Sequence, residues 1–344
     1  MLYEKFSDIA INKIIGIEAL IVCAVVFIFT VIATRLILPV LRARKLNQPI
    51  NMYVTEHASK SGTPTMGGIC FIISGLLIVL LWLFLELSGR LGSSGNVDLI
   101  PFALTFCLAV GNGLIGFIDD YKKLVRKENE GLSEGQKLVL QSVVAIAYIA
   151  MMAMTKNLPT AIAIPFTDLS LELSWGSYIV YFLFIIGFVN STNITDGIDG
   201  LASSVGVTVS ATVIALSYFA ASRYTAVSAA VLLGSLLGFL VFNHYPAKVF
   251  MGDTGSLYIG GLIMGCAISE GALLAVTIMS MVFILDMFSS FLQRYYYKAT
   301  KKRIFKKAPV HHHFQLLGWS EVKIDIVFVI VSLVFCAVGL LGAI

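Results

Sequence analysis

The chain has 344 residues, of which 58% are hydrophobic and only 13% are charged, and its formal net charge at pH 7 is +4. A soluble domain carries about 25% charged residues, and it could not bury the nonpolar surface of a chain whose mean hydropathy is +0.90. The composition therefore excludes a water-soluble globular protein and predicts an integral membrane protein.

A membrane-spanning helix needs about 20 mostly apolar residues, and by that measure the sequence contains about ten such segments. The first, near residues 14–41, is too long for a secretory signal and has no small-residue cleavage site, so we expect it to remain as an anchor. The segments lack the alternating polarity of membrane β-barrel strands, and no repeat or long linker divides the chain. We therefore predict an all-α, polytopic protein with a single domain over residues 1–344. The expected spans are centred near Phe27, Ile78, Leu108, Ala147, Phe184, Val213, Leu232, Ile263, Ile284 and Val334.

Basic residues predict the orientation of the chain, because cytoplasmic loops of membrane proteins carry an excess of Lys and Arg. If the N-terminus lies outside, most of the 24 Lys and Arg residues fall on the cytoplasmic side. An even number of spans then places both termini outside. The basic residues that would face outward are Lys5, Lys13, Arg90, Lys156 and Arg223.

Unusual polar sequences recur along the chain, and in this orientation each falls in a cytoplasmic loop or at a cytoplasmic helix end. In chain order they are "SKSGTPTMGG", "FIDDYKK", "NSTNITDGIDG", "FNHYPAKVFMGDTGS" and "KKAPVHHHF". The outer loops contain nothing comparable. We therefore expect these separate segments to meet in one site on the cytoplasmic face.

"FIDDYKK" places Asp119 and Asp120 at the exit of an apolar segment and follows them with lysines. Adjacent side chains on a helix point about 100° apart, so the two acids need not share one role. One can bind a metal while the other handles a proton or orients a group. The alternative is a solvated helix end without chemistry.

In "NSTNITDGIDG", Asn190, Asn193, Asp196 and Asp199 recur at every third residue. Three residues advance a helix by about 300°, so neighbours in this series would share a face. Acids at membrane depth cost roughly 2.5–3.5 kcal/mol each, which favours a functional role. The alternative is an interfacial helix end with ordinary capping groups.

In "MGDTGS", Asp253 precedes the apolar run "LYIGGLIMG". It could cap that helix, since Asp is a favoured N-cap residue. Alternatively, the helix N-terminus presents backbone N–H groups to a phosphate, and Asp253 turns toward a cation.

Together, the acids and lysines of these segments indicate phosphoryl chemistry. Acidic oxygens favour a hard cation, Mg²⁺ or Mn²⁺, over zinc, and Lys60, Lys123 and Lys137 would suit a polyphosphate anion. Positioning and charge neutralisation account for most of the catalysis in such reactions. The imidazoles of "HHHF", His311 to His313, can hydrogen-bond phosphate or sugar oxygens.

Two classes of function fit a multi-pass protein of this kind. The first is an enzyme that acts at the membrane surface on a phosphorylated substrate, and the second is an ion-coupled transporter whose acids form a relay. A relay predicts ionisable residues near the middle of the membrane, where Asp286 is a candidate, although it could equally make an interior polar contact. The acids gather at one face, which favours the enzyme.

The five polar segments resemble, in order and over essentially the whole chain, the motif set of the phospho-N-acetylmuramoyl-pentapeptide transferase family. This family is the bacterial peptidoglycan branch of the polyprenyl-phosphate N-acetylhexosamine-1-phosphate transferases. The Asp-Asp and "NITDGIDG" elements are shared across the superfamily, whereas the triple histidine and "TPTMGG" point to this branch. One departure is Gln315, where the branch usually carries Glu.

The resemblance implies Mg²⁺-dependent transfer of phospho-N-acetylmuramoyl-pentapeptide from its UDP derivative to undecaprenyl phosphate, which gives lipid I and UMP. Mn²⁺ is a possible substitute for Mg²⁺, and a sibling enzyme using UDP-N-acetylglucosamine is the alternative. The expected location is the bacterial plasma (inner) membrane, with the active site facing the cytoplasm. A homodimer and no nucleic-acid partner are expected. Direct attack and a covalent phospho-aspartate route both remain open.

The resemblance also implies roles for individual residues. Asp253 would be the principal metal ligand with Asp119 and Asp120 beside it, and Asp119 could instead deprotonate or orient the lipid phosphate. Phosphate binding is expected of Lys123 and Lys137. Nucleotide or substrate binding is expected of Lys60, Asn193, Asp196, Asp199, Asn243, Phe250 (by stacking on the uracil), His311, His312 and His313.

Overall fold

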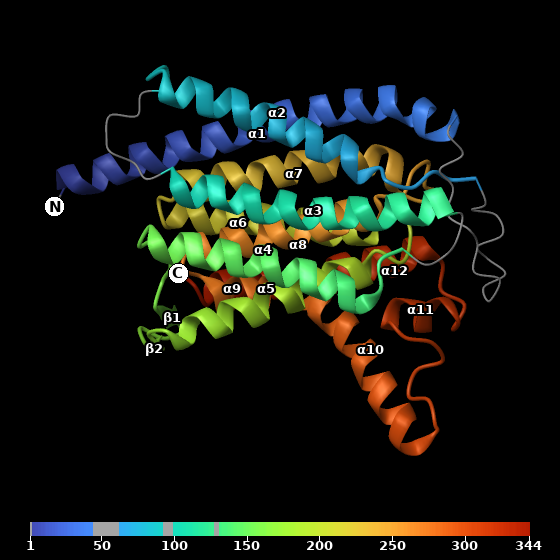
Figure 1. Cartoon of the computed structure of the whole chain (residues 1–344). Coiled ribbons are helices and arrows are strands. Elements are labelled where there is room, and N and C mark those ends of the chain that lie inside the picture. The colour runs from blue at the N-terminus through green and yellow to red at the C-terminus, as the bar shows by residue number, and fades with distance from the viewer. Residues whose placement is uncertain (1, 44–61, 92–98, 127–130) are drawn as a thin grey trace.

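Long helices account for most of the chain, and most of them run back and forth along one axis, whereas α10 leaves the bundle at an angle (Figure 1). The computed structural model describes residues 2–43, 62–91, 99–126 and 131–344. The helices are α1 (Leu2–Ala43), α2 (Gly68–Leu87), α3 (Ile100–Arg126), α4 (Glu134–Met154), α5 (Gly176–Thr195), α6 (Leu201–Phe219), α7 (Arg223–Asn243), α8 (Gly252–Ser269), α9 (Leu273–Met279), α10 (Met281–Thr300), α11 (Val310–Gln315) and α12 (Glu321–Leu341), and the strands are β1 (Ala161–Ala163) and β2 (Ser170–Glu172).

Most of these helices are long and apolar enough to cross a membrane. Eight described helices meet that description, and nine spans result if α9 and α10, bent by 76° relative to each other, form one broken span. The chain is therefore a multi-pass helical membrane protein, as its composition predicts. The expected count of about ten also requires α8, which has 18 residues and begins with the polar turn "GDTGS". Since α8 is not among the eight candidates, the full count stays a prediction.

The polar motifs gather at one end of the bundle. α1 starts and α12 ends at the left of Figure 1, whereas α3 ends and α4 begins at the right. Side-chain contacts place the end of α5 and the start of α8 beside the end of α3. Which compartment this end of the bundle faces stays a prediction.

Between α4 and α5 the chain forms a short antiparallel hairpin that the sequence analysis did not anticipate. β1 pairs with β2, with Ala161 opposite Glu172 and Ala163 opposite Ser170. Each strand has only 3 residues, which is too short to produce a clear alternation of polarity. The expected all-α class thus holds for the bundle but omits this hairpin.

α8 runs through the middle of the bundle and is buried over almost its whole length. It approaches α3 at glycine positions where a side chain would not fit. A Cβ added at Gly116 would lie 2.1 Å from the backbone oxygen of Asp253, and one at Gly261 would lie 2.8 Å from the Cα of Ala109. Small residues let helix backbones approach closely in membranes. Here that approach sets the start of α8 against the end of α3.

An ion-pair cluster around Arg223, the first residue of α7, joins three helices. Arg223 donates from Nε to Glu18 Oε2 of α1 at 2.6 Å and from Nη1 to Glu86 Oε1 of α2 at 2.9 Å. Trp82 Nε1 donates to Glu18 Oε1 at 2.8 Å. Because these side chains are largely withdrawn from solvent, the cluster stabilises the packing of α1, α2 and α7.

We expect Arg223→Gln to lower the thermal stability of the protein, because it removes the cation that pairs with the largely buried carboxylates of Glu18 and Glu86. Removing one partner of a buried charge pair costs about 2 kcal/mol or more. Arg294→Gln is the control, since Arg294 Nη2 lies 4.0 Å from Glu134 and both side chains are exposed. Unfolding temperatures in detergent would be compared, and equal temperatures for the two variants would contradict this role.

Candidate functional site

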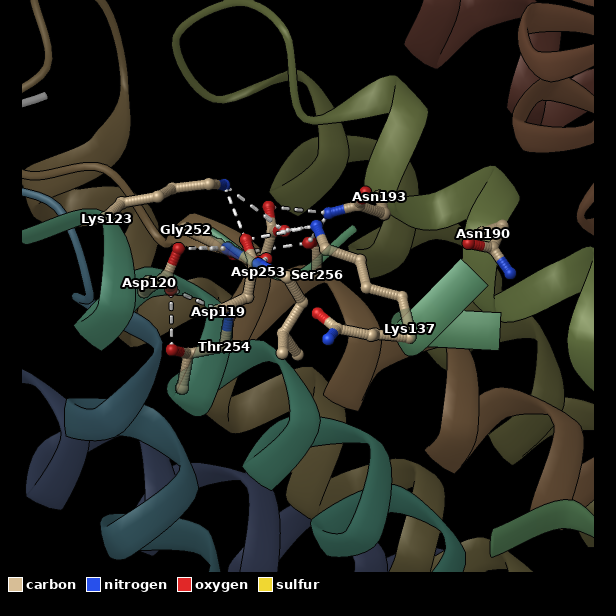
Figure 2. A network of polar contacts seen from close by, with 12 residues as sticks. Asp119, Asp120, Lys123, Lys137, Asn190, Asn193, Gly252, Asp253, Thr254 and Ser256 are labelled. Atoms are coloured by element: carbon tan, nitrogen blue, oxygen red, sulfur yellow. Dashed lines mark hydrogen bonds and ion pairs between the residues drawn. The ribbon is translucent and has the colours of Figure 1, made fainter. Parts of the chain in front are cut away.

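Three carboxylates from two helices meet at the polar end of the bundle (Figure 2). Asp119 and Asp120 belong to the last turns of α3, and Asp253 belongs to the first turn of α8. One oxygen from each lies within 4.8 Å of the others. The structure therefore brings together the three acids proposed from the sequence as metal ligands.

The two adjacent acids of α3 have different partners, as their angular separation on the helix predicts. Asp120 accepts from the backbone N–H groups of Asp253 at 3.2 Å and Thr254 at 3.0 Å, and from the Thr254 hydroxyl at 2.7 Å. Asp119 instead accepts from the Leu132 backbone N–H at 2.7 Å through Oδ1. Asp120 thus satisfies the N–H groups at the start of α8.

Asp253 does not cap its own helix, although capping was one of the two interpretations left open by the sequence. The N-cap of α8 is Met251, and among the described residues the donors at this helix start are satisfied by Asp120. The Asp253 carboxylate turns the other way. Its Oδ1 accepts from Asn193 Nδ2 at 2.9 Å, and its Oδ2 faces Lys123 and Lys137.

Both lysines expected to bind phosphate reach the acids from opposite sides (Figure 2). Lys123 Nζ lies 2.6 Å from Asp119 Oδ2 and 3.5 Å from Asp253 Oδ2. Lys137 Nζ, from the first turns of α4, lies 3.0 Å from Asp119 Oδ2 and 2.5 Å from Asp253 Oδ2. The ammonium groups therefore offset the repulsion among carboxylates that are withdrawn from water. Lys60 lies outside the described residues.

The "NSTNITDGIDG" segment is only partly helical, so the expected shared face does not extend along all of it. α5 ends at Thr195, and Asn190 and Asn193 are the members of the series that it contains. Asn193 donates to Asp253, whereas Asn190 donates to Gln141 Oε1 of α4 at 2.8 Å and stands apart from the acids (Figure 2).

The two acids of this segment lie in the connection between α5 and α6. Burial raises the pKa of the Asp196 carboxyl well above its usual range, and nearby carboxylates, Asp253 first among them, raise it further. Asp199 Oδ2 accepts from the backbone N–H of Ala247 at 2.9 Å, and its own N–H donates to Glu321 at 3.1 Å. Asp199 therefore holds the α7–α8 connection in place.

Asn243 and Phe250, both expected to contact the nucleotide, flank the connection between α7 and α8. Asn243 is buried, accepts from Ser203 Oγ at 3.0 Å and donates to the Val249 carbonyl at 3.0 Å. Its side chain is therefore bonded within the protein and shapes the loop. Phe250 is half-buried, and its backbone N–H donates to the Pro64 carbonyl at 2.9 Å, which places it beside the described part of "SKSGTPTMGG".

The three histidines of α11 have separate partners. His311 is fully buried, and its Nδ1 lies 2.7 Å from Asp286 Oδ2. His312 Nδ1 lies 2.7 Å from Gln315 Oε1, and His313 Nδ1 accepts from the backbone N–H of Lys306 at 3.1 Å. Asp286 therefore makes the interior polar contact that was one of its two interpretations.

Sequence reasoning missed two hydroxyls that hold this site together. The Thr254 hydroxyl donates to Asp120 at 2.7 Å, and Ser256 Oγ accepts from Asn193 Nδ2 at 2.9 Å. The signal that could have found them is the run of small polar residues in "GDTGS" at the start of an otherwise apolar helix.

The donor set suits a hard divalent cation. Carboxylate oxygens are the ligands that Mg²⁺ and Mn²⁺ prefer, and each of the three acids has an oxygen within the 4.8 Å group. Both oxygens of Asp120 accept hydrogen bonds from α8, whereas Oδ2 of Asp119 and Oδ2 of Asp253 face partners that are themselves cations, so these two acids are better placed to hold an ion. Asp119 Oδ2 is buried and pairs with the ammonium groups of Lys123 and Lys137.

Comparison with known proteins identifies the family. The phospho-N-acetylmuramoyl-pentapeptide-transferase from Bacillus subtilis (strain 168) is 38% identical over 317 residues, which cover 91% of this chain and 94% of that protein. The protein of the same name from Staphylococcus carnosus (strain TM300) is 38% identical over 323 residues, covering 92% and 96%, and that from Shouchella clausii (strain KSM-K16) is 39% identical over 315 residues, covering 91% and 94%.

The chain belongs to the phospho-N-acetylmuramoyl-pentapeptide-transferase family. A signature of this transferase, described as signature 1, matches residues 60–72. The broader family model, described as glycosyl transferase family 4, matches residues 102–271, which include all three clustered acids. The resemblance drawn from the five motifs is thereby confirmed.

Gln315, the departure from the transferase pattern, connects α11 with α12. Its Oε1 faces His312, and its Nε2 donates to Glu321 Oε1 at 3.4 Å. Glu321 in turn accepts from the backbone of Asp199. A glutamate at position 315 would bring a second carboxylate toward Glu321, whereas the amide can donate to it. Gln315 is thus compatible with the acid at position 321.

Proposed function

We propose that the protein transfers phospho-N-acetylmuramoyl-pentapeptide from its UDP derivative to undecaprenyl phosphate, giving lipid I and UMP. This reaction would be the first membrane step of peptidoglycan synthesis. The alignment with phospho-N-acetylmuramoyl-pentapeptide-transferases over nine-tenths of the chain supports it. The observation that carries it is the group of three carboxylates and two lysines at the polar end of a multi-pass bundle.

The chemistry needs two anions to approach each other. A phosphate oxygen of the lipid attacks the sugar-bearing β-phosphate, a P–O bond forms there, and the P–O bond to UMP breaks. One phosphoanhydride replaces another, so the protein mainly has to align the reactants and offset their charge. Lys123 and Lys137 would bind phosphate oxygens, and Asp119 would orient or deprotonate the attacking lipid phosphate. A divalent cation, Mg²⁺ or Mn²⁺, held by Asp253 with Asp119 and Asp120 would supply further charge neutralisation.

The nucleotide is proposed to bind along the connections that surround the acids. Candidates for direct contact are Asp196, whose carboxyl interacts electrostatically with Asp253 and Asp120, and Phe250, which is half-buried. Lys60 and the histidines of α11 are further candidates. Asn243 and Asp199 would act by shaping the loops they bond to.

The site is proposed to face the cytoplasm from the bacterial inner membrane. The excess of basic residues in the loops at the polar end supports this orientation, and it places the carboxylates near the level of lipid headgroups. A homodimer, a span count of about ten and a single domain over residues 1–344 remain predictions.

Release of UMP by the purified protein tests the proposal. With UDP-N-acetylmuramoyl-pentapeptide and undecaprenyl phosphate, we expect UMP to form in the presence of Mg²⁺, to stop in excess chelator and to resume when Mg²⁺ or Mn²⁺ is restored. The reason is that the three carboxylates already offset the charge of the two lysines, so the negative charge of the diphosphate needs a further cation to neutralise it. Unchanged UMP release in chelator would contradict the metal assignment. A preference for UDP-N-acetylglucosamine as donor would instead identify a sibling transferase.

A further inference from the structure

A buried acid–histidine pair lies next to the candidate site, and its acid, Asp286, is not used in the proposed reaction. Asp286 is in α10 and His311 is in α11, and both side chains have 0% exposure. His311 Nδ1 lies 2.7 Å from Asp286 Oδ2, and the His311 backbone N–H donates to Oδ1 at 3.4 Å. A carboxylate can only accept, so Nδ1 carries the proton in this contact. The carboxylate thus binds His311 at two points.

The other ring nitrogen of His311, Nε2, has no hydrogen-bond partner within the part of the chain that the structure describes, although the atom is buried. It faces Gly197 so closely that a Cβ added there would lie 2.2 Å from it. Gly197 follows Asp196 in the connection between α5 and α6. A buried polar atom without a partner is costly, so this nitrogen is suited to a ligand that enters beside that connection.

We infer that Asp286 is a positioning residue, which fixes His311 with Nδ1 protonated and presents Nε2 to the UDP-linked substrate at the Asp196–Gly197 connection. The identity of the ligand, a UDP-linked substrate, rests on the proposed function. The fixed tautomer is a property of the protein alone. Without the carboxylate, the ring is free to rotate or to move its proton to Nε2, and the substrate loses a defined hydrogen-bonding partner.

Nitrogen NMR of ¹⁵N-histidine-labelled protein tests the tautomer directly, with the His311 signal assigned from its absence in His311→Gln. We expect a protonated Nδ1 in the wild type and in Asp286→Asn, whose amide oxygen still accepts, and a loss of that state in Asp286→Leu. Ser289→Ala is the matched control, because Ser289 Oγ accepts from the Val310 N–H at 2.9 Å and donates to the Asp286 backbone carbonyl at 2.6 Å, so it bonds at the same junction without using the Asp286 carboxylate. An unprotonated Nδ1 in the wild type would overturn the inference, even if Asp286→Leu failed to fold.

The kinetic arm distinguishes positioning from general support of the fold. We expect Asp286→Leu to raise KM for the UDP-linked substrate by about tenfold, the equivalent of one good hydrogen bond. Asp286→Asn should recover most of this loss, and Ser289→Ala should behave as wild type. Equal KM changes in Asp286→Leu and Ser289→Ala would overturn the positioning role. If the wild type released no UMP, the proposed function would fail while the NMR result would still decide the tautomer.

Discussion

Replacing Asp253 by Asn is expected to reduce UMP release by about 10³-fold, at the upper end of what one preorganised electrostatic group contributes. The carboxylate is the meeting point of Asn193, Lys123 and Lys137, and the change removes its charge with little change in shape. The fold should survive, because the start of α8 is held by Asp120. The rate of UMP release and the unfolding temperature in detergent would be measured together.

Asp168→Asn provides the control for this charge change. Asp168 is an exposed acid between β1 and β2, so its loss should leave UMP release at the wild-type rate. An Asp253→Asn protein that is folded and retains more than a tenth of wild-type activity would remove Asp253 from the proposed mechanism.

Gly116→Ala is expected to lower UMP release by about 10²-fold, as a displacement of about 1 Å at a reacting centre can do. The added Cβ would stand 2.1 Å from the backbone oxygen of Asp253 and 2.5 Å from the nitrogen of Thr254. These are backbone atoms that cannot rotate away, so α3 and the first turn of α8 would have to separate. Asp253 would then move relative to Asp119, which stays on α3.

Gly187→Ala is the matched control for the glycine change. Gly187 also lies within a helix, α5, and a Cβ there would meet no described atom within 4 Å. Both variants gain the same methyl group and the same helix propensity, so a difference in activity isolates the contact between α3 and α8. Equal activities would mean that this close approach does not set the geometry of the acids.

The helical membrane architecture could be predicted from the sequence because it depends on composition and segment length. α2, around the expected centre Ile78, and α12, around Val334, are continuous apolar runs of about the length that a bilayer requires. α8 is different, since its glycines and polar first turn lower its hydropathy while its position inside the bundle keeps it buried. Its surroundings are other helices, which a local pattern does not reveal.

The candidate site could be predicted as a set of segments but not as a set of partners. Asp119 and Asp253 are far apart in the chain and meet through the contact between α3 and α8. For the same reason, the local sequence could not show that Asp120 would satisfy the start of a distant helix, or that Asn243 would bond to its own loop. The spacing in "NSTNITDGIDG" assumed a helix that ends at Thr195, so its periodicity applied to the first part alone.

The arrangement in which Lys123 and Lys137 rest on Asp119 and Asp253 has a thermodynamic consequence. While the ammonium groups neutralise the carboxylates, they are less available to an incoming diphosphate. A divalent ion bound among the carboxylates would neutralise them in place of the lysines. The lysine N–H groups would then be available to bind the phosphates. Ion and nucleotide would then enhance each other's affinity by the same factor, as linked equilibria require.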